Sequence, residues 1–113
     1  MAHDDRLTLG QMLDTVRRIR AMIRGQARAA FDGDELRQLA LLHLIQVLGE
    51  AASRVSAGFR DAHPELPWAQ MVGMRNRIVH GYEHVDPDVV WRVATEDVEP
   101  VLAALERFTA QGG

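Results

Sequence analysis

Arg75, Asn76 and His80 are the residues whose types and spacing best suit acid–base chemistry on an anion. Asn76 and His80 are four positions apart, so in a helix they share a face, and the amide can hydrogen-bond to the imidazole and fix its orientation. The planar guanidinium of Arg75 can bind a phosphate through two hydrogen bonds. Together these groups would suit cleavage of RNA by its own 2′-hydroxyl, with His80 transferring protons and Arg75 stabilising the charge that develops on phosphorus.

Two other interpretations of this stretch stay open from spacing alone. The first is a surface helix that ends in a solvated histidine. The second is a metal site, because His80 and His84 are also four positions apart. Gly81 is expected to end the helix between them, and beyond Glu83 or Asp86 no third ligand is near. We therefore expect neither a metal ion nor a cofactor.

The helix that carries these residues is predicted to follow the proline-containing break at 63–67. Pro67 suits the first position of a helix, and Gly81 can adopt the left-handed conformation that ends one. His80 should then project from the C-terminal end. Helical spacing is shown by the apolar residues Trp68, Met71, Val72, Ile78 and Val79.

Four further helices are predicted from apolar spacing and capping residues. The first lies between Thr8, a plausible cap, and Gly25, a plausible stop. A loop around 31–34 leads into a long helix from about Asp34 to Arg60, with Asp34 as its cap. The last two are less distinctly separated, since a helix starting at Asp86-Pro87 is restarted or bent between Asp97 and Pro100 and continues to about Ala110.

The long helix is apolar on more than one face, which favours a homodimer in a chain of this size. Within it, Gly49 is expected to permit a close helix crossing. His43, Glu50 and Arg54 share a face with Val47. They form either a paired set that stabilises the helix or, in the case of Glu50 and His43, support for the site at Arg75 and His80.

Length and composition indicate one all-α domain over residues 1–113. The chain has neither cysteine nor lysine, so all thirteen basic side chains are arginine, and disulfides, thiolate nucleophiles and lysine chemistry are excluded. A net charge of −3 argues against a broadly basic nucleic-acid surface, so any RNA contact must be local, and no DNA binding is expected. No apolar run is long enough for a membrane span, and we expect a cytoplasmic location.

Four landmarks, in the same order, resemble those of the HEPN superfamily and specifically of the HepT-like ribonuclease toxins. Arg75-Asn76 followed by His80-Gly81-Tyr82 resembles the Arg-x4-His-x-Tyr motif of that superfamily. The other landmarks are the Gly-Glu-Ala segment at 49–51, the His-Pro-x-x-Pro-Trp segment at 63–68, and Val85-Asp86 followed by Val90-Trp91.

The resemblance implies an antiparallel bundle of four to five helices that dimerises and cleaves RNA without metal in a cleft containing both copies of the motif. Arg75 and His80 would be catalytic, and Asn76 would support them. It also implies a type VII toxin–antitoxin pair, in which a cognate nucleotidyltransferase antitoxin adenylylates Tyr82. The bulky anionic group on Tyr82 would fill the cleft and repel RNA phosphate.

Two alternatives remain beside this hypothesis. One is a non-catalytic module that binds a nucleotide or a partner protein such as a nucleotidyltransferase. The other is a structural dimerisation domain, in which Arg75 and His80 could be replaced without loss. Trp68 and Trp91 could stack on bases, but their helical apolar spacing favours the core for both.

Overall fold

The computed structural model describes residues 4–79 and 86–111, and for 76–79 it describes the backbone alone. These residues form seven α-helices and one π-helical turn, with no strand among them, which agrees with the all-α prediction. In chain order the elements are α1 Asp5–Ile23, α2 Arg28–Asp32, α3 Glu35–Arg54, α4 Ala57–Ala62, α5 Trp68–Val79, α6 Pro87–Arg92, the turn η1 Val93–Asp97, and α7 Val98–Ala110.

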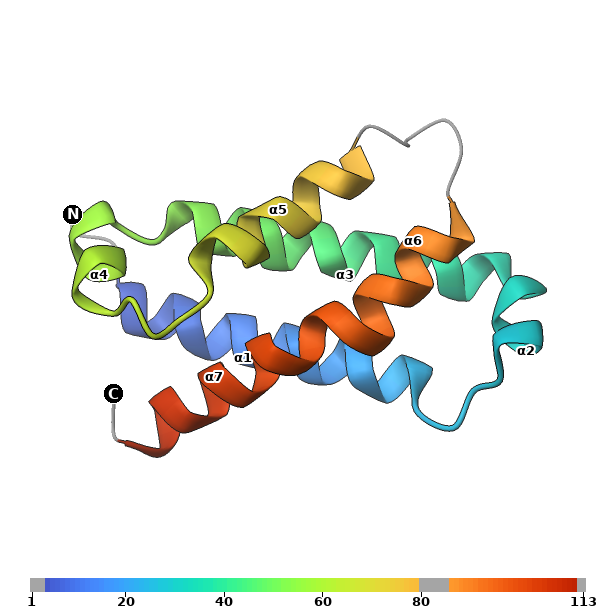
Figure 1. Ribbon diagram of the computed structural model, residues 1–113, viewed down its shortest axis with the longest axis horizontal. Coiled ribbons are helices and arrows are strands. Elements are labelled where there is room, and N and C mark those ends of the chain that lie inside the picture. The colour runs from blue at the N-terminus through green and yellow to red at the C-terminus, as the bar shows by residue number, and fades with distance from the viewer. Residues whose placement is uncertain (1–3, 80–85, 112–113) are drawn as a thin grey trace.

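The long helix α3 lies between α1 and α5 and packs against both (Figure 1). α1 runs antiparallel to α3 and also contacts α7, which follows α6 through η1 as a continuous helical segment. Apolar residues at helical spacing on each of these helices form one core. Its fully buried members include Met12, Val16, Ile19, Leu41, Ile45, Leu48, Met71 and Leu105.

α1 begins four residues earlier than predicted. Its cap is Asp4, whose carboxylate accepts a hydrogen bond from the backbone N–H of Leu7 at 3.1 Å. The predicted cap, Thr8, instead lies inside the helix, where it is buried and its hydroxyl donates to the carbonyl of Asp4. The choice of Thr8 was therefore wrong because an acidic side chain upstream satisfies the free N–H groups first. Gly25, with φ of +71°, follows the end of α1 as expected.

α3 is shorter than the predicted 34–60. Asp34 does cap it, accepting from the backbone N–H of Arg37 at 3.0 Å, but the helix ends at Arg54. The chain breaks there because Ser56 starts α4: its hydroxyl accepts from the N–H of Phe59. Asp5 of α1 fixes this break, since its carboxylate accepts from the N–H of Ser56 at 3.1 Å and from its hydroxyl at 2.7 Å.

The loop predicted around 31–34 is in part a helix, α2. Phe31 is fully buried in it and packs against Trp91 of α6, with ring centroids 5.1 Å apart. The side-chain amide of Gln38, itself buried, donates to the carbonyls of Phe31 and Asp32 and so satisfies the end of this short helix. The apolar anchor and the amide together stabilise a turn that local sequence would leave irregular.

α5 begins at Trp68, directly after Pro67, rather than at Pro67 itself. α6 begins as predicted, with Pro87 at its first position and Asp86 as its cap, accepting from the N–H of Asp88 at 2.9 Å. The restart predicted between Asp97 and Pro100 is present as the change from η1 to α7 at Val98. Among the helices described, none combines the length and apolar character that a membrane crossing requires. Gly81, the predicted end of α5, lies outside the described residues.

Candidate functional site

Helices α3 and α5 touch at Gly49 and Arg75. A Cβ atom placed on Gly49 would lie 2.4 Å from Cβ of Arg75 and 3.4 Å from its Cα and Cγ. The two helices therefore meet with no room for a side chain at position 49, and the close crossing predicted at this glycine is confirmed. The same contact positions Arg75, because the base of its side chain rests on the backbone of α3.

The side chain of Arg75 is half-buried beside Glu50. Its Nε lies 3.9 Å from Oε1 of Glu50, which is an ion pair rather than a hydrogen bond. That Nε is shielded from solvent and has no hydrogen-bond partner in the described part of the chain. A shielded guanidinium donor without a hydrogen-bond acceptor is unusual, and the rest of the Arg75 side chain, which is 38% exposed, can still bind an anion at this surface.

Glu50 thus faces α5 more than the other members of its predicted set. His43, Glu50 and Arg54 are all exposed on α3. Over the residues described, no hydrogen bond or ion pair joins Glu50 to His43 or Arg54, whereas Glu50 does pair with Arg75. Of the two suggested supporting residues, the structure places Glu50 beside Arg75, whereas among the described residues no hydrogen bond or ion pair joins His43 to Arg75.

Of the remaining predicted site residues, the structure describes only Asn76, and only its backbone. Asn76 follows Arg75 in α5, where its backbone alone is described. His80 and Tyr82 lie outside the described residues, so their roles remain predictions. Among the described residues, in 4–79 and 86–111, no group of three carboxylate, imidazole or thiol side chains is placed to bind a metal ion.

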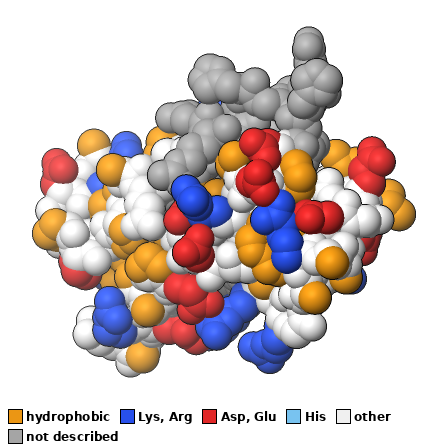
Figure 2. Space-filling model, turned by 45° about the vertical axis from the view of Figure 1, so that its right-hand side comes forward, with side chains coloured by type: hydrophobic (Ala, Val, Ile, Leu, Met, Phe, Trp, Pro, Cys, Tyr) orange, Lys and Arg blue, Asp and Glu red, His pale blue; other side chains and the backbone are white. Residues whose placement is uncertain are grey.

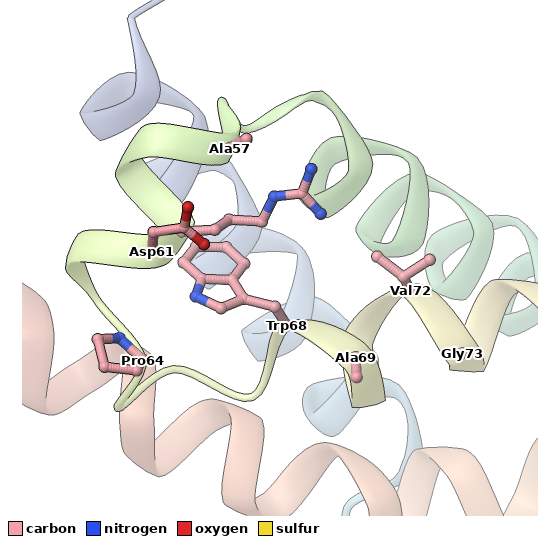
Figure 3. A pocket seen from close by; sticks show the side chains of 8 residues that line it. Ala57, Asp61, Pro64, Trp68, Ala69, Val72 and Gly73 are labelled. Atoms are coloured by element: carbon pink, nitrogen blue, oxygen red, sulfur yellow. The ribbon is translucent and has the colours of Figure 1, made fainter.

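A groove between α4 and α5, which spacing within single helices did not predict, opens beside this crossing. Its volume is about 850 Å³, and Trp68 forms part of its wall instead of lying wholly in the core (Figure 3). The other lining residues are Ala57, Arg60, Asp61, Pro64, Ala69, Val72 and Gly73. The sequence signal for this groove is weak, but small residues at 69 and 73 on one line of α5 are consistent with an uncovered surface.

Trp91, by contrast, contributes to packing between α2 and α6. Its ring contacts Phe31, and the guanidinium of Arg28 lies 5.8 Å from the ring centroid. Arg28 also pairs with Asp32 at 2.7 Å and with Asp88, and hydrogen bonds to these carboxylates raise the pKa of Arg28 above its ordinary value. The prediction that Trp91 belongs with the core rather than with a ligand agrees with these contacts.

Arginines near the N-terminus do not form an isolated basic surface. Arg17 pairs with Glu106 at 3.2 Å and Arg20 with Glu99 at 3.4 Å, so this face of α1 is bound to acidic residues of α7. Acidic and arginine side chains are also interspersed on the face shown in Figure 2. These ion pairs favour a solvated structural surface over an extended RNA-binding one.

Comparison with known proteins agrees with the landmarks. The family model described as "Ribonuclease HepT-like" matches residues 12–108. A protein of Thermococcus cleftensis named "Probable ribonuclease HepT" is 32% identical over 75 residues, which cover 66% of this chain and 68% of that protein. "Putative RNase MJ1380" of Methanocaldococcus jannaschii is 30% identical over 76 residues, covering 67% of this chain and 70% of its own.

No solved structure matches the chain. The family model nevertheless spans α3 and α5 entirely, including Gly49, Glu50 and Arg75, where the two helices cross. The chain therefore belongs to the HepT-like ribonuclease family.

Proposed function

We propose that this protein is the toxin of a toxin–antitoxin pair and acts as a metal-independent endoribonuclease through Arg75, Asn76 and His80. The observation that carries the proposal is the crossing of α3 and α5, where Gly49 and Glu50 hold the half-buried Arg75 in a chain of a ribonuclease family. A guanidinium that is fixed at its base, and whose Nε has an ion-pair partner but no hydrogen-bond acceptor, suits an anionic ligand.

The reaction follows from the chemistry of these groups. His80 removes the proton from a ribose 2′-hydroxyl, whose oxygen then attacks the adjacent phosphorus. The bond from phosphorus to the 5′-oxygen breaks, and that oxygen takes up the proton that the imidazolium of His80 returns, so the products are a 2′,3′-cyclic phosphate and a free 5′-hydroxyl. Arg75 stabilises the charge on the non-bridging oxygens in the transition state, and Asn76 orients His80.

The site is completed by a second copy of the chain in this proposal. α3 exposes Leu36, with 81% of its surface accessible, and Leu39, with 43%. Leu36, His43 and Glu50 are seven residues apart in turn, so they follow one side of α3 from the exposed leucines towards Arg75. A copy that covers this side would bring two arginines and two histidines to one phosphodiester.

The proposed regulator is a cognate nucleotidyltransferase that transfers AMP to the hydroxyl of Tyr82. The modified residue would lie two positions beyond His80 and would add negative charge where RNA phosphate must enter. Intact mass of the protein co-expressed with such an enzyme should increase by one or more AMP units, and Tyr82→Phe should abolish the increase. An unmodified protein in a stable inhibited complex would instead point to steric blocking.

Single substitutions test the catalytic assignment. Arg75→Ala and His80→Ala should each keep the melting temperature and reduce the rate of RNA cleavage at least about 100-fold, because each removes a group that acts in the transition state. His84→Ala, a histidine in the same stretch without an assigned role, is the matched control and should cleave normally. Undiminished cleavage by His80→Ala would refute the mechanism, and no cleavage by the unmodified wild type would favour a binding module.

A further inference from the structure

We propose that the groove between α4 and α5 binds a nucleotide of single-stranded RNA next to the cleavage site, with its base stacked on Trp68 and its polar groups bound by Arg60 and Asp61. This inference rests on the proposed ribonuclease function and extends it to where the substrate lies. The groove holds about 850 Å³, within the range of small-ligand pockets and ample for a nucleotide.

Trp68 is held in a fixed orientation at the groove wall. Its indole N–H donates to the carbonyl of His63 at 2.9 Å, and the ring of Phe59 meets it edge-on with centroids 6.4 Å apart. The polar atom of the indole is therefore satisfied within the protein, and what the ring offers the groove is its apolar surface. Such a preorganised aromatic surface suits stacking of a base without strong sequence preference.

Arg60 supplies a donor that has no acceptor. Its Nε is shielded from solvent and makes no hydrogen bond within the described chain. A phosphate oxygen or a base carbonyl in the groove could bind the guanidinium of Arg60 without displacing a hydrogen-bond partner. The need for an acceptor at a groove wall distinguishes Arg60 from Arg17 and Arg20, which already pair with carboxylates of α7.

Asp61 sets the chemical class of the ligand. The groove contains one arginine and one aspartate, so its formal charge is neutral, and a ligand that is only an anion would be repelled by the carboxylate. A nucleotide offers both kinds of partner: phosphate or carbonyl oxygens for Arg60, and amino or ribose hydroxyl groups for Asp61. In Figure 3 the side chains of Asp61 and Trp68 project into the space between α4 and α5.

The groove lies on the same side of α5 as position 76, the first described position of the predicted motif after Arg75. Ala69, Val72 and Gly73 line it, and position 76 is three residues beyond Gly73, so these positions form one line on the helix. At 1.5 Å per residue, Gly73 and position 76 are about 5 Å apart along the axis. An RNA strand that follows this line passes from the groove directly to the motif, and the small side chains at 69 and 73 leave its path open.

RNA cleavage kinetics test the site against its simplest alternatives. Trp68→Leu and Arg60→Gln should raise KM for a short single-stranded RNA about tenfold or more with kcat nearly retained, since they remove substrate binding away from the reacting atoms. Trp68→Phe should recover most of the affinity. Trp91→Phe, in the tryptophan that packs between α2 and α6, is the matched control and should leave KM unchanged.

A binding measurement separates this inference from the proposed function. In the double variant Trp91→Phe/His80→Ala, Trp68 is the only tryptophan. Addition of a short RNA should quench its fluorescence, and Arg60→Gln in this background should weaken the titration. Cleavage by wild type combined with unchanged KM in both groove variants would overturn the nucleotide site alone. A weakened dimer with unchanged KM would assign the groove to the subunit interface and also overturn it. Absence of cleavage by wild type would instead count against the proposed function.

Discussion

The contact between Gly49 and Arg75 depends on the absence of a single carbon atom. Glycine is unfavourable inside a helix by about 1 kcal/mol relative to alanine, so local preference alone argues against it in α3. The distance of 2.4 Å from an added Cβ to Cβ of Arg75 shows why glycine is nevertheless required. The tertiary contact outweighs the helix propensity at this position.

Gly49→Ala should therefore destabilise the protein by about 1–3 kcal/mol, because α3 and α5 must separate to admit the methyl group. Urea unfolding followed by circular dichroism measures this change, and cleavage of RNA should fall with it as Arg75 moves. Gly10→Ala in α1 is the control: nothing lies within 4 Å of its added Cβ, and it should stabilise by about 0.5–1 kcal/mol. Equal stability of Gly49→Ala and wild type would contradict the crossing.

At the scale of elements, side-chain carboxylates and hydroxyls determine where several of the helices begin. Asp4, Asp34 and Ser56 each accept a hydrogen bond at the start of a helix, and Asp5 ties the start of α4 to α1. The carboxylate of Asp34 accepts hydrogen bonds from the backbone N–H and from the side chain of Arg37. These bonds, chiefly the one from the backbone, hold the pKa of Asp34 below its ordinary value.

This depressed pKa has a defined consequence for stability. A carboxylate whose pKa is lower in the folded state contributes stability above roughly pH 4 and loses it as the pH falls through the folded-state value. Asp34→Ala should lower the melting temperature by a few degrees at pH 7, and the difference from wild type should shrink towards pH 2.

Asp34→Asn is the control for this comparison, because an asparagine side chain still caps the helix but does not titrate. The melting temperature of this variant should be close to that of wild type at pH 7, and its helix cap should persist in acid. Melting curves recorded by circular dichroism from pH 7 to pH 2 check both variants. If the melting temperatures of wild type and Asp34→Ala differed by the same amount at every pH, the charge of Asp34 would not contribute to stability.

At the scale of the whole molecule, α3 has one side in the core and another side exposed to solvent. One side is buried against α1 and α5, while Leu36 and Leu39 remain exposed. Exposed leucines on the side of α3 that also carries Glu50 favour a partner surface along this side of the helix.

The double substitution Leu36→Glu/Leu39→Glu should yield a folded monomer that no longer cleaves RNA, because charges on this surface oppose association and the proposed site is built from two copies of the chain. Sedimentation velocity gives the assembly state and circular dichroism the fold. Leu7→Glu, at a leucine of α1 that is also exposed, controls for the added charge and should remain dimeric and active. A monomeric variant with full activity would show that one chain suffices.

The sequence predicted α1, α3, α5, α6 and α7, with the short α6 marked by its Asp86-Pro87 start, and missed α2 and the separate helix α4 for a physical reason. Apolar spacing identifies a helix that spans several turns, as in α1, α3 and α7, whereas α2 and α4 have five and six residues and too few turns to show a period. Their ends depend on long-range contacts, such as those of Asp5 with Ser56, that local sequence does not reveal.

The sequence names the residues of the candidate site but indicates only part of their arrangement. Spacing within α5 placed Arg75 one position from Asn76 but could not indicate which helix Arg75 would meet. The resemblance marked both Gly49 and Arg75, and the structure adds that they touch. The groove at Arg60 and Trp68 depends on how α4 turns back towards α5, so it could not be derived from periodicity.

The π-helical turn η1 also determines which changes in chain length the protein tolerates. A π-turn holds one residue more than an α-turn, and each residue of a helix rotates the chain by about 100°. Deleting one residue between 93 and 97 would convert this π-turn into an α-turn and leave the apolar side of α7, with Val101, Leu105 and Phe108, facing the core. A single-residue deletion within α7 itself would instead rotate every later side chain by about 100° and move several core residues at once.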